Sequence, residues 1–310
     1  MVDDAFAFIV GSPRSGTTIL GKILDGHDNI AQWYEPYFIW DKKFRNARDD
    51  VRSAMDCTPA ISRYIYNKFR KYKKRRGCRV VIDKSPRNSL KIPFIRHIFP
   101  NAKFVHIIRD GRDATLSIHK EWQRRMSIVE GQGREKKFNY REAFKTITKW
   151  LERQPFIDDK MRALYFETRG NIFNKTRHLN RLRWNGEVGW GPQFADWKDA
   201  KQRYTLLQFN AMQWERCVSS ILQHWDDIPE ANRLQFRYED MLTQPERIFV
   251  DLMNFLDVSV DEAFFQFLPT LKVNNFNKWQ TAFAPPEIEE IKPILTPMLQ
   301  QLGYLATTPW

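Results

Sequence analysis

Ala5-Phe-Ala-Phe-Ile-Val10-Gly-Ser-Pro-Arg-Ser-Gly16-Thr-Thr-Ile-Leu20 is the stretch that decides the fold. An apolar run ends in a loop with two glycines, and an amphipathic segment from Thr18 to Leu24 follows. Strand, glycine loop and helix in this order predict backbone N–H groups that bind a phosphate at a helix N-terminus. The glycine spacing is that of a P-loop, but Thr17 stands where a nucleoside triphosphatase has lysine. We therefore expect a ligand whose 5′-phosphate carries something other than a triphosphate tail.

Further strand and helix patterns alternate along the chain. Arg79–Ile82 and Lys103–Ile108 are apolar, β-branched runs followed by helical patterns, and Arg233–Phe236 resembles a fourth strand. Such alternation predicts a right-handed parallel sheet. We expect an α/β fold, a P-loop-type parallel sheet flanked by helices, in a single domain of residues 1–310. The expected helices are Thr18–Leu24, Ile61–Lys73, Arg87–Ile98, Asp113–Gln123, Leu206–His224, Pro245–Leu256 and Pro286–Gln301.

Residues 123–203 break this alternation. Two helical patterns, Arg141–Arg153 and Asp158–Thr168, precede a stretch rich in Gly, Asn and Trp. A long irregular segment in a compact α/β protein is typical of a lid or a binding loop. We expect a mostly helical and irregular insertion over 123–203 that binds substrate, and the alternative is a merely structural excursion.

The net charge of +13 is unevenly distributed. Residues 68–76 carry seven basic side chains and no acid, and residues 120–185 carry 17 basic and 8 acidic side chains. Either region could face an anion or could be a solvated surface. A nucleic-acid-binding protein would also be basic, but that interpretation leaves the phosphate loop unexplained, so we expect no nucleic-acid partner.

The three cysteines, Cys57, Cys78 and Cys217, are scattered and lack metal-ligand spacing. This pattern favours a reduced, cytoplasmic protein. The chain shows no run of about 18 apolar residues and no signal-peptide pattern, so we expect no transmembrane segment. The oligomeric state cannot be predicted from the sequence.

Charged side chains follow the ends of two predicted strands. Arg109 comes directly after Lys103–Ile108, and Ser117 lies eight residues further on. Ligands of open parallel sheets bind outside the carboxyl ends of strands, so this guanidinium and hydroxyl could hold one phosphate. Lys84 follows Arg79–Ile82 and could neutralise charge on a group in transfer.

Together these motifs resemble those of sulfotransferases that use 3′-phosphoadenosine 5′-phosphosulfate (PAPS). The matching segments are Pro13-Arg-Ser-Gly-Thr-Thr18, Asp83-Lys84-Ser-Pro, Arg109-Asp-Gly-Arg with Ser117, Arg237-Tyr-Glu-Asp-Met-Leu with Pro245-Glu, and Lys278-Trp279 with Leu302-Gly-Tyr. The resemblance covers most of the chain outside about 123–203. It implies a sulfotransferase that moves a sulfonate group from PAPS to an acceptor hydroxyl and releases adenosine 3′,5′-bisphosphate (PAP), with no metal required.

The resemblance also implies which residues hold the donor. Around the 5′-phosphosulfate it places Ser12, Pro13, Arg14, Ser15, Gly16, Thr17 and Thr18; at the 3′-phosphate Arg109 and Ser117; and as further contacts Tyr238 and Lys278. Parts of the family carry a serine in a late loop, where this chain has Asn274 and Asn275, whose roles stay open. Asp83 is the only acid near the position of the magnesium-binding acid of a P-loop kinase or triphosphatase, and it is interpreted as structural.

Glu35 is the implied general base. The branch with protein-tyrosine sulfotransferases and many bacterial enzymes has a glutamate about 22 residues after the loop proline, and Glu35 lies 22 residues after Pro13 (35 − 13). The cytosolic branch uses a histidine, for which His27, His106 and His119 are the local candidates, ranked below Glu35. Lys84 and Arg14 would stabilise charge during transfer.

The acceptor is open. Trp33, Tyr34, Tyr37 and Trp40 flank Glu35 and could line an aromatic pocket or belong to the core. A glycan, lipid, peptide or small aromatic alcohol could carry the hydroxyl, and the basic insertion would suit an anionic acceptor.

Overall fold

The computed structural model describes residues 5–44, 47–130, 183–184, 187–260, 265, 268, 271 and 273–310. The chain divides into two compact units, residues 1–119 with 191–310, and residues 120–190. The helices expected at 141–153 and 158–168, and most of the basic region 120–185, lie outside the described residues. The insertion expected over 123–203 therefore stays a prediction.

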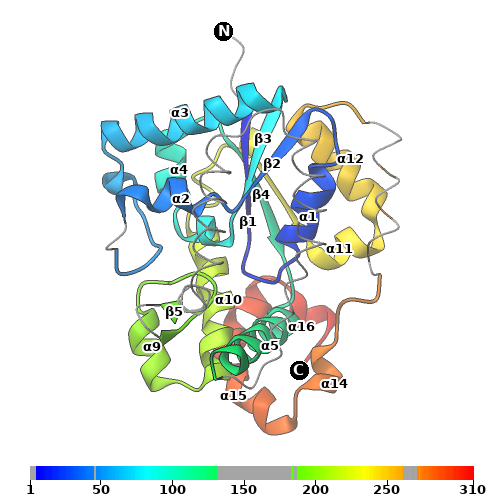
Figure 1. Ribbon diagram of the computed structural model, residues 1–310. Coiled ribbons are helices and arrows are strands. Elements are labelled where there is room, and N and C mark those ends of the chain that lie inside the picture. Colours follow the sequence, from blue (N-terminus) through cyan, green and yellow to red (C-terminus); the bar gives the residue numbers. More distant parts are fainter. Residues whose placement is uncertain are drawn as a thin grey trace, which may run out of the picture. The chain divides into compact units, whose positions relative to one another are not determined.

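A five-stranded parallel sheet forms the centre of the first unit, in the order β2-β3-β1-β4-β7 (Figure 1). Its strands are β1 (Ala5–Val10), β2 (Ile30–Tyr34), β3 (Val80–Lys84), β4 (Lys103–Ile108) and β7 (Arg233–Arg237). The predicted α/β fold with a parallel sheet flanked by helices is confirmed. Two details differ from expectation. β2 was not predicted, and β3 runs on through Asp83 to Lys84, which is its last residue rather than the residue beyond it.

Alternation along the strands divides the core into two layers. In β1, Ala7 and Ile9 face one apolar cluster, whereas Phe6, Phe8 and Val10 face the other. This alternation follows from the two-residue period of a strand. α1 (Thr17–Leu24), α11 (Tyr238–Thr243) and α12 (Pro245–Leu256) cover the first face, and α3 (Pro59–Arg76) and α4 (Ile92–Ile98) cover the second (Figure 1).

Local signals set the ends of these helices. The hydroxyl of Thr58 accepts the N–H of Ile61 at the start of α3, and Gly77 ends that helix with φ 61°. A left-handed residue at this position is a common helix stop that favours glycine. The single helix expected over Arg87–Ile98 is instead a 3₁₀ helix, η3 (Pro86–Leu90), followed by α4. Pro93, in the first turn of α4, cannot continue a helix from residues before it.

Further helices lie beyond the carboxyl ends of the strands (Figure 1). They are α5 (Gly111–Val129), α9 (Trp197–Arg203), α10 (Leu206–Gln223), α14 (Trp279–Ala282), α15 (Pro285–Gln301) and α16 (Tyr304–Thr307). α10 starts at a capping box of Thr205 and Gln208 and packs against α15. The indole N–H of Trp214, on α10, donates to the carbonyl of Arg109 at 3.2 Å. This contact ties the helical layer to the end of β4.

Within the second unit, β5 (Arg183–Trp184) and β6 (Glu187–Val188) form a short antiparallel pair. The rings of Trp122 and Trp184 meet edge to face at 5.3 Å. No helix in the described part of the chain has the length and apolar character of a membrane span.

Candidate active site

The loop between β1 and α1 adopts a conformation that depends on glycine. Gly16 has φ 92°, and a Cβ there would lie 2.4 Å from the ring of Tyr238. Gly16 is also the N-cap residue of α1 and has no side chain, so it leaves the first N–H groups of this helix without a side-chain cap from that position. The hydroxyl of Ser89 supports the loop from η3, because it accepts from the N–H of Gly11 at 3.1 Å and donates to the carbonyl of Gly11 at 3.0 Å.

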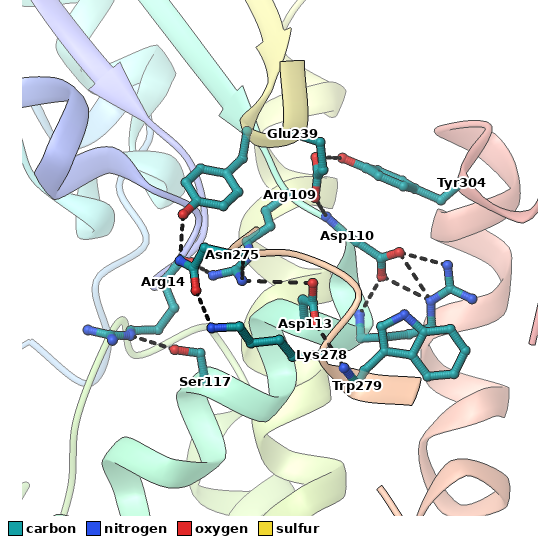
Figure 2. A network of polar contacts seen from close by, with 12 residues as sticks. Arg14, Arg109, Asp110, Asp113, Ser117, Glu239, Asn275, Lys278, Trp279 and Tyr304 are labelled. Atoms are coloured by element: carbon teal, nitrogen blue, oxygen red, sulfur yellow. Dashed lines mark hydrogen bonds and ion pairs between the residues drawn. The ribbon is translucent and has the colours of Figure 1, made fainter. Parts of the chain in front are cut away.

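Arg14 joins this loop to the second predicted motif (Figure 2). Its Nε donates to the hydroxyl of Ser117 at 2.9 Å, and its carbonyl accepts from Nη1 of Arg109 at 2.9 Å. Arg14 is exposed and has φ 66°. A side-chain-bearing residue in the left-handed region is strained by roughly 1–3 kcal/mol, and such strain often marks a functional site. The structure thus brings together the two phosphate motifs that the sequence proposed separately.

Arg109 lies at the centre of this cluster, buried behind the loop (Figure 2). Its Nη2 donates to the carbonyl of Asn275 at 2.9 Å, and its guanidinium stacks on the ring of Tyr238 at 4.6 Å. Its Nε is buried and has no hydrogen-bond partner within the described residues. Because a buried unpaired donor is costly, this N–H is positioned to receive an acceptor oxygen from a ligand.

A late loop, residues 273–278, closes the cluster from the other side. The amide of Asn275 donates to the hydroxyl of Tyr238 at 2.7 Å, and its oxygen accepts from Nζ of Lys278 at 2.6 Å. The backbone N–H of Trp279 donates to Oδ1 of Asp113 at 3.0 Å. Tyr238 contacts Arg109 directly and Lys278 does so through Asn275, and their expected contacts with the donor stay a prediction.

A fully buried ion pair supports this cluster from below. Nη2 of Arg112 lies 2.7 Å from Oδ2 of Asp110, and its guanidinium stacks on Trp279 at 4.1 Å. Nε of Arg112 donates to Asp110 as well, and Nη1 donates to the carbonyls of Thr308 and Pro309, which fixes the carboxyl-terminal residues against α5. A buried ion pair is tolerated only when its remaining hydrogen bonds are satisfied, as they are for Arg112.

Lys84 and Glu35 form a second cluster at the ends of β3 and β2. Nζ of Lys84 lies 2.6 Å from Oε1 of Glu35, and the two side chains are 1% and 25% exposed. Burial lowers the pKa of Lys84, the nearby carboxylate of Glu35 acts in the opposite direction, and the positive charge of Arg14 lowers this pKa further. Glu35 has φ 44°, the second strained residue of the site. Because the charge of Arg14 acts on Lys84, the pair of Lys84 and Glu35 lies near the cluster of Arg14 and Arg109.

The other titratable candidates have structural partners. Asp83 accepts from the indole of Trp40 at 2.7 Å and the hydroxyl of Ser85 at 2.6 Å, and complete burial raises its pKa to about 6. His27 contacts the carbonyl of Ser259 at 2.9 Å, and His106 contacts Gln235 at 3.0 Å. The third histidine, His119, contacts the side chain of Asn210 at 3.0 Å.

The aromatic residues around Glu35 differ in how far they are exposed to solvent. Trp33 stacks on Tyr72 at 4.2 Å, and both Trp33 and Trp40 belong to the core. Tyr37 is partly buried under the guanidinium of Arg87 at 4.6 Å. Tyr34 is exposed, and its ring lies 4.4 Å from Nζ of Lys84. Of the four aromatic residues proposed to contact the acceptor, Tyr34 presents the most open surface.

Sequence reasoning missed Ser89 and Asp113. Ser89 contacts Gly11 across 78 residues, and Asp113 contacts Trp279 across 166. No local pattern marks a serine or an aspartate for such contacts. The only local signal is that each lies within about ten residues of a motif, Lys84 or Arg109.

Comparison with known proteins assigns this site to a family. A model described as the sulfotransferase family matches residues 7–168, slightly more than half of the chain. The chain belongs to the sulfotransferase family. It is therefore an enzyme that transfers a sulfonate group, as the resemblance implied. Within the described residues, no group of three or more His, Cys, Asp or Glu side chains is arranged to hold a metal ion.

Two relatives and two solved structures illustrate the similarity. Protein-tyrosine sulfotransferase 1 of Homo sapiens is 23% identical over 314 residues, covering 97% of this chain and 70% of the relative. A putative protein-tyrosine sulfotransferase of Caenorhabditis briggsae is 30% identical over 133 residues, covering 39% and 44%. The sulfotransferase domain from the curacin biosynthetic pathway aligns with a TM-score of 0.54 at 14% identity, covering 94% of this sulfotransferase and 96% of that chain. The sulfotransferase from Alicyclobacillus acidocaldarius aligns with a TM-score of 0.50 at 15% identity, covering 96% and 94%. The structures support the fold, and the relatives carry the name of the branch that the motifs resemble.

Proposed function

We propose that this enzyme takes the sulfonate group from PAPS. The observation that carries the proposal is the convergence of two phosphate motifs, since Arg14 contacts both Ser117 and Arg109. The residues fit the donor at two points. Within the described residues, the buried Nε of Arg109 has no hydrogen-bond acceptor. The N-terminus of α1 has no side-chain cap from its N-cap residue, Gly16. Both offer N–H donors to phosphate oxygens.

The chain offers candidate residues for both phosphate groups of this donor. Residues 12–18 would hold the 5′-phosphosulfate, and Arg109 and Ser117 the 3′-phosphate, with Tyr238 and Lys278 beside them. When bound, PAPS supplies an activated sulfonate group whose transfer releases PAP. Thr17 in place of the P-loop lysine supports this assignment, because a single bridging phosphate needs less positive charge than a triphosphate tail does.

We assign the proton transfer to Glu35. Its carboxylate would take the proton of the acceptor hydroxyl, while Lys84 and Arg14 would stabilise negative charge on the sulfonate and on the departing phosphate oxygen. The side chain of Lys84 is only 1% exposed, and a cation in such a dry position acts more strongly than one in water. Sulfonate transfer resembles phosphoryl transfer in that positioning and charge stabilisation dominate.

We further propose that the acceptor hydroxyl lies on an aromatic ring such as a tyrosine side chain. Tyr34 and Phe38, 46% and 44% exposed, flank Glu35, and the ring of Phe38 packs 6.3 Å from that of Trp33. Exposed aromatic faces favour a planar, apolar partner. The names of the relatives, protein-tyrosine sulfotransferases, support the same class.

The contacts of Arg87 give no support for an anionic acceptor group beside Tyr37. Arg87 is the cation beside Tyr37, and its guanidinium pairs with Asp41 at 2.7 Å and with Asp50 at 3.0 Å. Its charge is therefore balanced. The suggestion of an anionic acceptor rested on region 120–185, most of which lies outside the described residues.

We propose a metal-free reaction in the cytoplasm. All three cysteines are free and buried, which supports a reducing compartment. Transfer in the presence of excess chelator at the rate seen without it would support the first part, and restoration of a lost rate by Mg²⁺ would overturn it.

Ligand-induced thermal stabilisation tests the donor assignment. PAP without Mg²⁺ should raise the unfolding midpoint, because a ligand bound to the native state stabilises it by mass action. ATP with Mg²⁺, or an oligonucleotide, should leave the midpoint nearly unchanged. Stabilisation by ATP–Mg²⁺ and not by PAP would support a triphosphatase and overturn the proposal. Labelled PAPS with tyrosine peptides, phenols and sugars as acceptors would then rank the acceptor classes.

A further inference from the structure

Asp113 is a buried carboxylate that the proposed mechanism does not use. It lies in the first turn of α5, and its side chain is 1% exposed. A buried ion costs several kcal/mol unless its contacts compensate, so the contacts of Asp113 identify what it does.

The two carboxylate oxygens of Asp113 have different surroundings. Oδ1 accepts the N–H of Trp279 at 3.0 Å, whereas Oδ2 lies 3.8 Å from Nη2 of Arg109, too far for a hydrogen bond. Within the described residues Oδ2 has no hydrogen-bond partner. Burial raises the pKa of Asp113, and the positive charge of Arg109 offsets only part of that rise. The well-formed contact of Asp113 is therefore its hydrogen bond to the late loop, rather than its charge.

Hydrogen bonds hold the late loop at two points. Asn275 is bound by Arg109 through its carbonyl and by Tyr238 through its amide. Trp279, four residues further on, is bound by Asp113. Lys278 lies between these two points, and its Nζ is directed to the side chain of Asn275 at 2.6 Å (Figure 2). Without the hydrogen bond to Asp113, Trp279 would keep its stacking contact with Arg112, but its backbone N–H would lose its acceptor, so the segment that carries Lys278 would be held less tightly.

We propose that Asp113 is a positioning residue for the 3′-phosphate of the donor. By accepting the N–H of Trp279 it holds Asn275 and Lys278 beside Arg109, where the 3′-phosphate would bind. This inference rests on the proposed donor site, and it assigns the effect to the hydrogen bond that Oδ1 accepts, not to the negative charge.

Two ligands and two variants separate these effects. PAP carries the 3′-phosphate and adenosine 5′-monophosphate (AMP) lacks it, and calorimetry measures the affinity for each. In Asp113→Ala the loop loses its acceptor, so we expect PAP to bind about 10-fold more weakly while AMP changes by less than about 2-fold. Asp113→Asn keeps an amide oxygen for the N–H of Trp279, so its affinity for PAP should stay within about 3-fold of the native value. In transfer assays Asp113→Ala should raise the donor KM about 10-fold and change kcat less than about 2-fold.

Three outcomes distinguish the inference from its premise. Equal loss of PAP affinity in Asp113→Asn and Asp113→Ala would overturn it, because the charge would then be what matters. A parallel loss of AMP affinity would also overturn it, since the role would be general to the fold. Native protein that binds PAP no better than AMP would instead overturn the donor site itself. If Asp113→Ala does not fold, Asp113→Ser, whose hydroxyl is too short to reach Trp279, takes its place.

Discussion

Both ends of the parallel sheet carry several cationic side chains, but these side chains differ in burial and in bonding. At the amino end, a groove of about 890 Å³ is lined by Lys73, Arg79 and Lys103 together with Asp257. Arg79 pairs with Asp257, and the two side chains are 55% and 73% exposed. Such an exposed pair contributes only about 0–1 kcal/mol. The basic run 68–76 ends in the same region, because Gly77 and Cys78 line the groove.

At the carboxyl end three cations are buried and bonded, beside the exposed Arg14 and Lys278. The side chains of Lys84, Arg109 and Arg112 are 1%, 8% and 0% exposed, and each has a carboxylate neighbour within 4 Å. Arg14, Glu35 and Asn277 have left-handed backbones at this end, whereas at the amino end Asp257 has one beside an exposed ion pair. Both burial of charge and backbone strain cost stability, so their coincidence marks the functional end of the sheet. Counting charges along the sequence does not separate the two ends, whereas burial does.

The largest expected effect tests the buried pair at the carboxyl end. Glu35→Gln or Lys84→Ala should lower kcat by about 100-fold or more, the range typical of one acid–base or electrostatic group, with little change in PAP affinity. Steady-state transfer assays and calorimetry measure the two quantities. Turnover close to the native rate in Glu35→Gln would exclude Glu35 as the base.

The next effect compares two arginines from opposite ends. Arg109→Ala should weaken PAP binding by about 1.5–3 kcal/mol, the range for a hydrogen bond to a charged group, which is about 10- to 150-fold in Kd. Arg79→Ala removes the same charge at the amino end and should change Kd by less than about 2-fold. Calorimetry at one salt concentration measures both. Equal losses in the two variants would mean that overall charge, rather than the site, attracts PAP.

A pH measurement compares two buried groups of the parallel sheet, Asp83 on β3 and His106 on β4. Burial raises the pKa of Asp83 from 3.8 to about 6 and lowers that of His106 from 6.5 to about 4. Between about pH 4 and 6 the native state binds the Asp83 proton more tightly than the unfolded state, so this group's stabilising contribution falls as pH rises. His106 has the opposite sign over about pH 4 to 6.5, because the unfolded state binds its proton more tightly.

The two contributions should nearly cancel in the native protein. As the pH rises from about 4.5 to 5.5, the unfolding free energy of Asp83→Asn should rise by about 1 kcal/mol relative to that of the native protein. Over the same range, the unfolding free energy of His106→Gln should fall by a similar amount relative to the native protein. Denaturant unfolding at several pH values measures these slopes. Parallel pH profiles for all three proteins would show that neither group has a shifted pKa.

The smallest effect concerns the exposed cations of the amino end. Lys71→Ala and Lys74→Ala, on the exposed side of α3, should leave kcat/KM within about 2-fold and stability within about 0.5 kcal/mol. A transfer assay with a tyrosine peptide checks the first and thermal unfolding the second. A large fall in kcat/KM would mean that the acceptor reaches the amino end and that the two ends are less distinct than their burial indicates.

Sequence reasoning succeeded where the signal was local. The strand, loop and helix at Ala5–Leu24 are specified by apolar period and glycine spacing, and the structure confirms them. Arg109 and Ser117 lie eight residues apart on one strand end and helix, so their proximity also followed from local geometry. β2 was missed because Ile30-Ala-Gln-Trp-Tyr34 lacks the β-branched run that identified the other strands. Pairing with β3, rather than its own composition, makes this segment a strand.

The sequence by itself determined the strand–loop–helix unit, the phosphate motifs and, through them, the family. Only the tertiary structure decided that Glu35 meets Lys84, 49 residues away, and that Asp113 meets Trp279, 166 residues away. It also decided which cations are buried. The reason is physical. Local patterns specify backbone geometry over a few turns, whereas contacts across the chain depend on the order in which strands pair, and no single segment encodes that order.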